Sequence, residues 1–170
     1  MEILIVGVLI VALMVYASTK IKRSAAEAFE EETIETDEFS LLKPEGFLNP
    51  VEREDFLAFY AFSKDFGDED TAEKLRQSLI KLKVLGGRSL TEICRDIKSN
   101  FEKVLTEEKP DANTVLLKGE RSEKDVETIL YHKIIAAREK IFDLEMTVLA
   151  DYAEKYEERA EKLQASFRVK

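Results

Sequence analysis

The chain has 170 residues, a formal net charge of −9 and a single cysteine, and these properties exclude several classes of protein. A chain of this length holds one domain of ordinary size. Its acidic balance disfavours binding to nucleic acid, because the phosphates repel an acidic surface. Cys94 has no cysteine partner for a disulfide, and with the only histidine, His132, it forms no zinc-binding pattern. We therefore expect one domain with no nucleic-acid partner, no metal site and no cofactor.

The first expected element is an apolar segment, residues 3–19, that carries no charged side chain. As a helix it would extend roughly 26 Å, near the lower limit for crossing a bilayer. Three basic residues follow the segment directly, Lys20, Lys22 and Arg23. The only charged side chain before it is that of Glu2. Because basic residues accumulate on the cytoplasmic side, the sequence predicts a single-pass anchor in the cell membrane with the following domain in the cytoplasm. The lipid bilayer is then a partner of residues 3–19.

A cleaved signal peptide is the alternative interpretation of the same segment. Val15 and Ala17 are small enough for a cleavage site before Ser18. A signal peptide, however, carries its positive charge ahead of the apolar core, and here the charge follows it. The order of the charges favours the uncleaved anchor, and the sequence leaves cleavage open.

The chain divides into three parts by composition: a transmembrane anchor at residues 1–19, a charged juxtamembrane stalk at 20–38 and a soluble domain at 39–170. Alanine and glutamate are frequent in the first part of the stalk, which favours helix. We expect the membrane helix to continue to about Glu32 and then to fray. The acidic side chains of the stalk are expected to be a solvated spacer.

Three strands are expected in the first part of the soluble domain. They begin with residues 39–42, which run into a turn marked by Pro44 and Gly46. Residues 56–63 are rich in aromatic side chains, and residues 78–85 alternate between apolar and lysine side chains.

A helix is expected to follow Gly86 and Gly87. Ser89 and Glu92 have the spacing of a capping box at its N-terminus. Apolar residues then recur at helical spacing and form its expected buried face. They are Ile93, Cys94, Ile97, Phe101, Val104 and Leu105.

Residues 114–117 are expected to form a short strand, and the region 126–149 fits either a long helix or a β-hairpin. Phe142, Leu144 and Met146 alternate with polar residues, which favours a strand. We expect a hairpin with its turn at residues 138–140, although the turn lacks glycine and asparagine.

The last expected element is a helix with Asp151 as its cap and Glu154 closing a capping box. Four apolar residues share one of its faces: Tyr152, Tyr156, Leu163 and Phe167. The complete order predicts an α+β fold in which an antiparallel β-sheet of about six strands packs with two amphipathic helices.

Phe47 and Leu48 are the candidate partner-contact residues. They are apolar, and they lie in the segment from Pro44 to Pro50, which has the composition of an exposed turn. Packing of both side chains against the sheet is the alternative.

The order of elements resembles that of the PsbP-like domains, in which helices sandwich a sheet. The resemblance rests on residues 39–47, which read as a strand followed by Pro-Glu-Gly-Phe, and on Gly87 with Ser89-Leu90 before the first helix. Ser166-Phe167 after the last helix completes it. The resemblance covers about residues 39–168 and implies a binding or assembly factor without catalytic residues.

No residue pattern indicates a reaction. Asp65-Phe66-Gly67 matches a kinase magnesium motif, but the other kinase motifs are missing from the sequence. His132 is the only histidine, and no nucleophile elbow is present. The sequence favours a membrane-anchored, non-enzymatic module that binds a membrane protein. The alternative is a small membrane-tethered hydrolase or transferase that acts on a membrane-proximal substrate.

Overall fold

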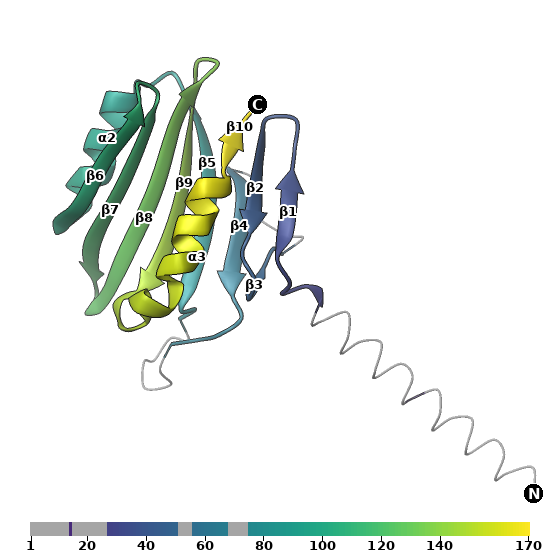
Figure 1. The fold of residues 1–170 in the computed structure, drawn as a ribbon. Helices are drawn as coiled ribbons and strands as arrows, with labels where there is room; N and C mark the ends of the chain where they lie inside the picture. Colours follow the sequence, from purple (N-terminus) through teal and green to yellow (C-terminus); the bar gives the residue numbers. More distant parts are fainter. Residues whose placement is uncertain (1–13, 15–26, 51–55, 68–74) are drawn as a thin grey trace, which may run out of the picture.

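The computed structural model describes residue 14 and residues 27–50, 56–67 and 75–170 (Figure 1). Apart from Met14, the predicted anchor lies outside the described residues. Within the described part, no helix combines the length and the apolar character needed to cross a membrane.

The main element is an antiparallel sheet of seven strands in the order β3-β4-β5-β9-β8-β7-β6 (Figure 1). The sequence predicted one sheet of about six strands. It missed the two edge strands of this sheet, β3 and β6, and the predicted strand at residues 39–42 lies in a second sheet. The strands are β3 (Phe47–Leu48), β4 (Leu57–Ser63), β5 (Ser78–Gly86), β6 (Lys103–Asp111), β7 (Thr114–Glu123), β8 (Val126–Ala137) and β9 (Lys140–Leu149).

A second, small sheet has the order β1-β2-β10 and joins the two ends of the described chain. Its strands are β1 (Glu32–Glu35), β2 (Phe39–Lys43) and β10 (Arg168–Val169). Among the described residues, two helices complete the fold, α2 (Leu90–Ser99) and α3 (Ala153–Ser166), together with the 3₁₀ turn η1 (Ala150–Tyr152). The predicted α+β class with two helices is confirmed.

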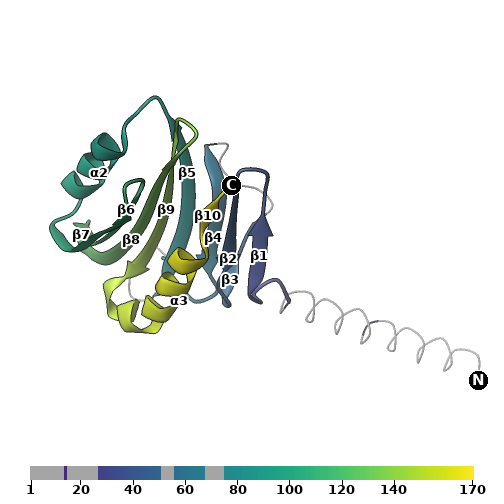
Figure 2. The same ribbon diagram turned by 45° about the horizontal axis from the view of Figure 1, so that its top comes forward.

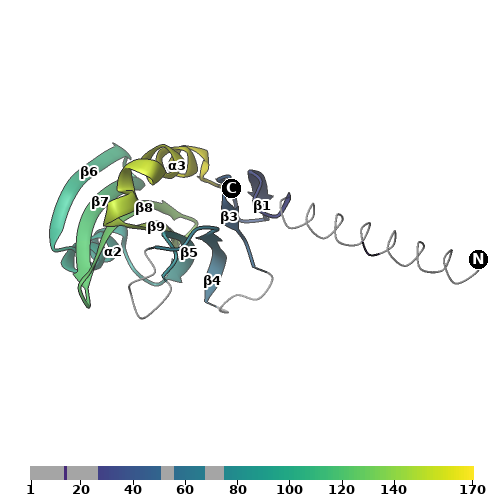
Figure 3. The ribbon, with the colours of Figure 1, turned by 90° about the horizontal axis from the view of Figure 1, so that it is seen from below.

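The two helices lie on opposite faces of the seven-stranded sheet (Figures 2 and 3). Alternation along β8 and β9 places one set of side chains under each helix. Phe142, Leu144 and Met146 belong to the larger core, which α3 covers. Ile134 and Ile141 belong to the smaller core under α2. Each strand of the central hairpin therefore contributes to two cores.

Helix α2 begins where the sequence predicts and ends earlier. The capping box of Ser89 and Glu92 is present, with both of its hydrogen bonds. The helix ends at Ser99. Phe101, Val104 and Leu105 were expected on its buried face and instead lie beyond its end, Val104 and Leu105 in β6. Val104 is 41% exposed. The expected helical face ran past Asn100, whose backbone N–H instead closes the last turn.

The region 126–149 is a β-hairpin, and β8 and β9 pair in one continuous antiparallel register. Arg138 and Glu139 form its two-residue turn, with φ angles of 51° and 62°. Positive φ at both central residues is the conformation of a type I′ turn, which matches the twist of the strands. The twist of the hairpin therefore selects this turn, although its residues are not the preferred ones.

The strain at this turn gives a testable prediction. The double substitution Arg138→Asn and Glu139→Gly places the preferred residues at the two positive-φ positions. We expect the free energy of unfolding to rise by about 1 kcal/mol, measured by urea denaturation. The same substitution at Ser122 and Glu123, in the strand before the other turn, should not stabilise the protein.

The start of α3 differs from the prediction. Asp151 does not cap the helix, because it lies within η1, and Tyr152 at the N-cap makes no side-chain hydrogen bond to the helix. The 3₁₀ turn itself binds the first helical N–H group, since the amide of Ala153 donates to the carbonyl of Ala150. The expected buried face is otherwise present in Tyr156, Leu163 and Phe167.

The N-terminal boundary of the folded unit also differs from the prediction. Residues 32–35, assigned from the sequence to the stalk, form β1 and pair with β2. The amine of Lys43 is 1% exposed and donates to the carbonyl oxygens of Ala28 and Phe47. The folded unit therefore includes Ala28 and does not begin at Phe39. Thr33 and Ile34 are β-branched and suit a strand, but the surrounding glutamates hide this preference.

Candidate functional site

A groove with a volume of about 810 Å³ lies between α3 and the β6 end of the sheet. We call it the α3 groove. Strands β7 and β8 form its floor with Leu116, Lys118, Tyr131 and Ile135, because even-numbered residues of β7 and odd-numbered residues of β8 share this face. Glu157 and Glu161 of α3 line one wall, and residues of β6 line the other.

An ion pair crosses the α3 groove. The amine of Lys118 on β7 donates to the carboxylate of Glu157 on α3 at 2.7 Å and lies 4.9 Å from the centre of the Tyr131 ring. Burial acts to lower the pKa of Lys118, but Glu157 and Tyr131 together raise it above its ordinary value. Burial raises the pKa of the Tyr131 hydroxyl. At neutral pH the floor therefore presents an ammonium group beside a neutral phenol.

Lys133 fixes the C-terminal end of the helical wall. Its amine donates to the carbonyl oxygens of Gln164 and Phe167, at 2.6 and 3.0 Å. These carbonyls lie at the end of α3, where the helix leaves acceptors unpaired. Burial lowers the pKa of Lys133, and the charge of Arg168 lowers it further. The side chain of Gln164 adds a hydrogen bond to the carbonyl of His132, so α3 is held on the sheet beside the groove.

The opposite wall is an edge strand. Within the described residues, β6 pairs with β7 and with no other strand, and eight of its nine residues are exposed. An edge strand presents unpaired backbone N–H and C=O groups, which bind extended peptides. The α3 groove therefore combines a floor of apolar and charged side chains with free backbone groups along one side.

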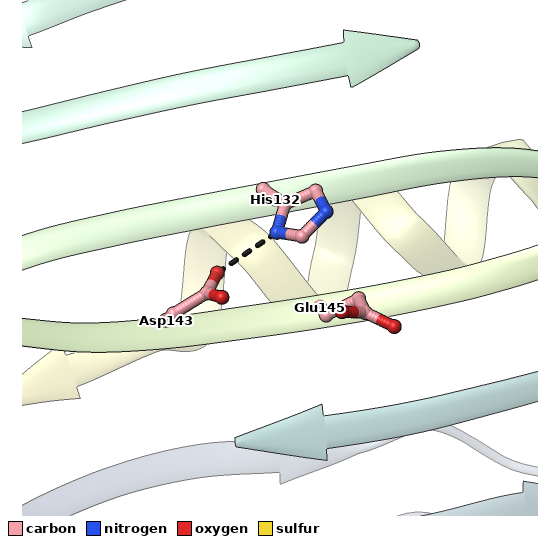
Figure 4. Close-up of side chains that lie close together, drawn as sticks. All are labelled: His132, Asp143 and Glu145. Atoms are coloured by element: carbon pink, nitrogen blue, oxygen red, sulfur yellow. Dashed lines mark hydrogen bonds and ion pairs between the residues drawn. The ribbon is translucent and has the colours of Figure 1, made fainter. Parts of the chain in front are cut away.

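A buried polar cluster lies on the opposite face of the sheet, the face that α2 covers in part (Figure 4). Nδ1 of His132 on β8 lies 2.8 Å from Oδ1 of Asp143 on β9, and both side chains are buried. Glu145 is the direct cross-strand partner of His132. One donor atom from each residue lies within 4.8 Å of the others. Within the described chain, these three residues are the group of histidine and acidic side chains that could hold a metal ion.

Neighbouring side chains hold the cluster in place. The hydroxyl of Thr147 donates to Oε1 of Glu145 at 3.1 Å, and the amine of Lys83 lies 3.7 Å from Oε2 of Glu145. The ring of Phe101 lies 5.8 Å from the imidazole, between ring centres. It fits there because Gly119 has no side chain; a Cβ would lie 2.3 Å from the Phe101 ring. His132 is thereby enclosed between an aromatic ring and a carboxylate.

The charge of Glu145 should stabilise the fold. Burial acts to raise the pKa of its carboxyl group, but His132, Lys83 and Lys81 together lower it below the ordinary value of 4.5. Ionised Glu145 therefore contributes its full stability at pH values above the ordinary pKa of the carboxyl group. The contribution is lost as the pH falls through the lower pKa of the folded state.

We expect Glu145→Gln to reduce the free energy of unfolding at pH 7 and to have little effect at pH 3, measured by urea denaturation in EDTA. Glu127→Gln, at an exposed position of β8, is the matched control and should change little at either pH. An equal loss from Glu145→Gln at both pH values would contradict a role for the charge.

The two candidate partner-contact residues do not lie in the α3 groove. Phe47 is 0% exposed and packs edge-on against Tyr156 of α3, with ring centres 5.8 Å apart. For Phe47 the structure therefore supports the alternative of packing in the core. Leu48 is half-buried in β3, and a partner contact there stays a prediction. Cys94 lies on the buried face of α2, and burial raises the pKa of its thiol.

No family model matches the chain, and neither does any curated protein. Solved structures do match it. They include the Saccharomyces cerevisiae Ran-binding protein Mog1p, at 12% identity and a TM-score of 0.57, over 83% of this chain and 96% of that chain. LpqN of Mycobacterium tuberculosis, involved in cell envelope biogenesis, matches at 12% identity and a TM-score of 0.53, over 82% of this chain and 90% of that chain.

A third match decides the fold. Cyanobacterial PsbP from Synechocystis is similar at 13% identity and a TM-score of 0.51, over 83% of this chain and 92% of that chain. The fold is PsbP-like. The resemblance predicted from the sequence is therefore confirmed at the level of the fold, and at this identity the likeness extends no further than the PsbP-like fold.

Proposed function

We propose that this chain is a membrane-anchored, non-enzymatic binding module and that its protein partner docks in the α3 groove. The observation that carries the proposal is the groove itself, about 810 Å³ in volume, with one wall formed by an exposed edge strand. Lys133 and Gln164 hold the helical wall on the sheet, so the groove is formed before a partner arrives. A preformed surface binds with a smaller loss of conformational entropy.

The name of one similar protein agrees with a binding role. Mog1p is described as a Ran-binding protein, and LpqN as a protein involved in cell envelope biogenesis. Neither name identifies the partner of this chain. The acidic charge of the chain favours a protein partner over nucleic acid.

The anchor defines the setting of the proposal. Residues 3–19 would hold the domain at the cell membrane, and the basic residues at 20–23 would place it on the cytoplasmic side. Tethering raises the concentration of the domain near other membrane proteins, so a moderate affinity in the groove suffices. We therefore propose a partner within the membrane or bound to it.

Fractionation and protease protection test the anchor. We expect the full chain in the membrane pellet after carbonate washing, and a variant without residues 3–19 in the supernatant. The domain should resist protease added to intact spheroplasts and be digested after lysis. Digestion in intact spheroplasts would contradict the cytoplasmic orientation.

Affinity capture from detergent-solubilised membranes tests the groove. Leu116→Arg places a long charged side chain on the groove floor, and Leu79→Arg makes the same change at a half-buried position on the opposite face. A partner recovered with wild type and with Leu79→Arg, but not with Leu116→Arg, would support docking there. Equal recovery with Leu116→Arg would contradict it, provided that both variants give the same circular dichroism spectrum as wild type.

A further inference from the structure

The cluster of His132, Asp143 and Glu145 has the backbone arrangement of a metal site on a sheet. Asp143 and Glu145 are two residues apart on β9, so their side chains leave the same face. His132 lies directly opposite Glu145 on the neighbouring strand. The positions of three donors are thus fixed by two adjacent strands, with donor atoms already within 4.8 Å of one another.

The distances are close to those of a coordination sphere. Ligands around a tetrahedral zinc ion bind at about 2.0–2.2 Å, which places neighbouring donors roughly 3.3 Å apart. Nδ1 of His132 and Oδ1 of Asp143 lie 2.8 Å apart and share a hydrogen bond, which a metal ion bound to both residues would replace with release of the proton. The donor atoms of all three residues lie within 4.8 Å of one another, so a rotation of the Glu145 side chain would bring its carboxylate to the ion.

The charges of the cluster call for a nearby cation. Two carboxylates lie close together in a largely buried position, where their mutual repulsion is poorly screened. Lys83 approaches Glu145 at 3.7 Å, longer than a good hydrogen bond, and its side chain is 35% exposed. Lys83 shares the compensation of the carboxylates with His132, which faces both of them, and its partly exposed amine can withdraw into solvent. A divalent ion bound to all three donors would compensate both charges directly.

The surroundings match those of known metal centres in physical terms. Metal ligands are commonly oriented by hydrogen bonds from neighbouring side chains, and an apolar shell controls the access of water to the ion. Here Thr147 orients Glu145, and Phe101 covers the imidazole from the Gly119 side. One imidazole nitrogen and two carboxylate oxygens form a donor set that Zn²⁺ accepts, and the fourth position would remain open to water.

We propose that His132, Asp143 and Glu145 bind one divalent transition-metal ion, Zn²⁺ by preference, and that Lys83 competes with the ion as a counter-cation. The site lies on the face of the sheet opposite the α3 groove, and the proposal is independent of partner docking. It assigns a role to the only histidine of the chain.

Metal titration of the full chain in detergent micelles, without a histidine tag, tests the proposal. Co²⁺ is the spectroscopic probe, and Zn²⁺ is then added in competition. We expect one Co²⁺ per chain with visible d–d absorption, displaced by one equivalent of Zn²⁺. His132→Gln should weaken binding by more than about 100-fold and Glu145→Gln by at least about 10-fold. Glu127→Gln, exposed on β8, should bind as wild type does.

Lys83→Met distinguishes the proposed site from a purely structural ion-pair cluster. If Lys83 and the metal compete, its removal should raise the metal affinity several-fold. Unchanged or weaker binding by Lys83→Met would overturn the competition. Co²⁺ binding that survives His132→Gln unchanged would overturn the site.

A measurement on the wild-type chain keeps the test valid if a ligand variant does not fold. Because the chain has one histidine, the imidazole signals in an NMR spectrum belong to His132 alone. Addition of one equivalent of Zn²⁺ should shift these signals. Further Zn²⁺, beyond one ion per chain, should not shift them again. Imidazole signals that do not move at one equivalent would overturn the proposal.

Discussion

Substitution of Phe47 by alanine is expected to lower the free energy of unfolding by about 3–5 kcal/mol. The side chain is 0% exposed, belongs to the larger core and lies edge-on against Tyr156. Its removal would leave a cavity between β3 and α3, because the short β3 is held on one side by β4 and cannot close the gap. Urea denaturation followed by circular dichroism measures the change.

Leu48→Ala is the matched control for Phe47→Ala. Leu48 is the next residue of β3, points to the other side and is half-buried. We expect Leu48→Ala to lower the free energy of unfolding by about 1 kcal/mol or less. A loss of similar size from both variants would contradict the assignment of Phe47 to the core. Loss of partner capture with Leu48→Ala would support the partner contact predicted from the sequence.

Lys43→Met should also have a large effect, a loss of about 3 kcal/mol in the free energy of unfolding. The buried amine donates to the carbonyl oxygens of Ala28 and Phe47, at 2.9 and 3.0 Å. It also lies 3.6 Å from the carboxylate of Glu32. Methionine has a similar length but no donor, so both carbonyls would lose this hydrogen bond at a buried position.

Local and global measurements separate the two consequences of Lys43→Met. Hydrogen exchange should become faster at the amides of β1 and β3, because Lys43 ties these segments together. Lys103→Met, at an exposed position of β6, is the control and should change neither stability nor exchange. Unchanged exchange at Gly46, whose amide donates to the carbonyl of Phe29, would contradict this role of Lys43.

The sequence predicted the elements whose local signals agree with their environment. The capping box at Ser89 identified the start of α2, and the alternation around Leu144 identified a strand buried on one face. The twist of the strands does not appear in a sequence pattern. The hairpin was predicted correctly, but the sequence did not show why Arg138 and Glu139 form its turn, because these are not the usual residues at positive φ.

The elements that the sequence missed are those stabilised by neighbours rather than by their own composition. Edge strand β6 is mostly polar and pairs on one side with β7, so its residues alternate only weakly in burial. Strand β1 is rich in glutamate and depends on pairing with β2 and on the hydrogen bonds of Lys43. Such strands exist because the sheet offers an edge, which local propensity does not register.

The candidate sites were hidden from the sequence for a similar reason. His132 and Asp143 are eleven residues apart and meet only through the register of β8 and β9. Asp143 and Glu145 occupy the polar positions of the alternation in β9, yet both are largely buried. The α3 groove depends on how far α3 covers the sheet, and that is a property of packing.

The central claim is that the α3 groove is the surface that binds the partner, and site-specific photocrosslinking in intact cells tests it most directly. A benzophenone side chain at Glu161 would lie in the groove wall, and one at Lys162 would leave the same helix away from the groove. Both positions are exposed, so neither substitution should disturb the fold. We expect a crosslinked adduct to a membrane protein from position 161 and none from position 162. An adduct from position 162 alone, equal adducts from both positions, or no adduct from either would contradict the claim.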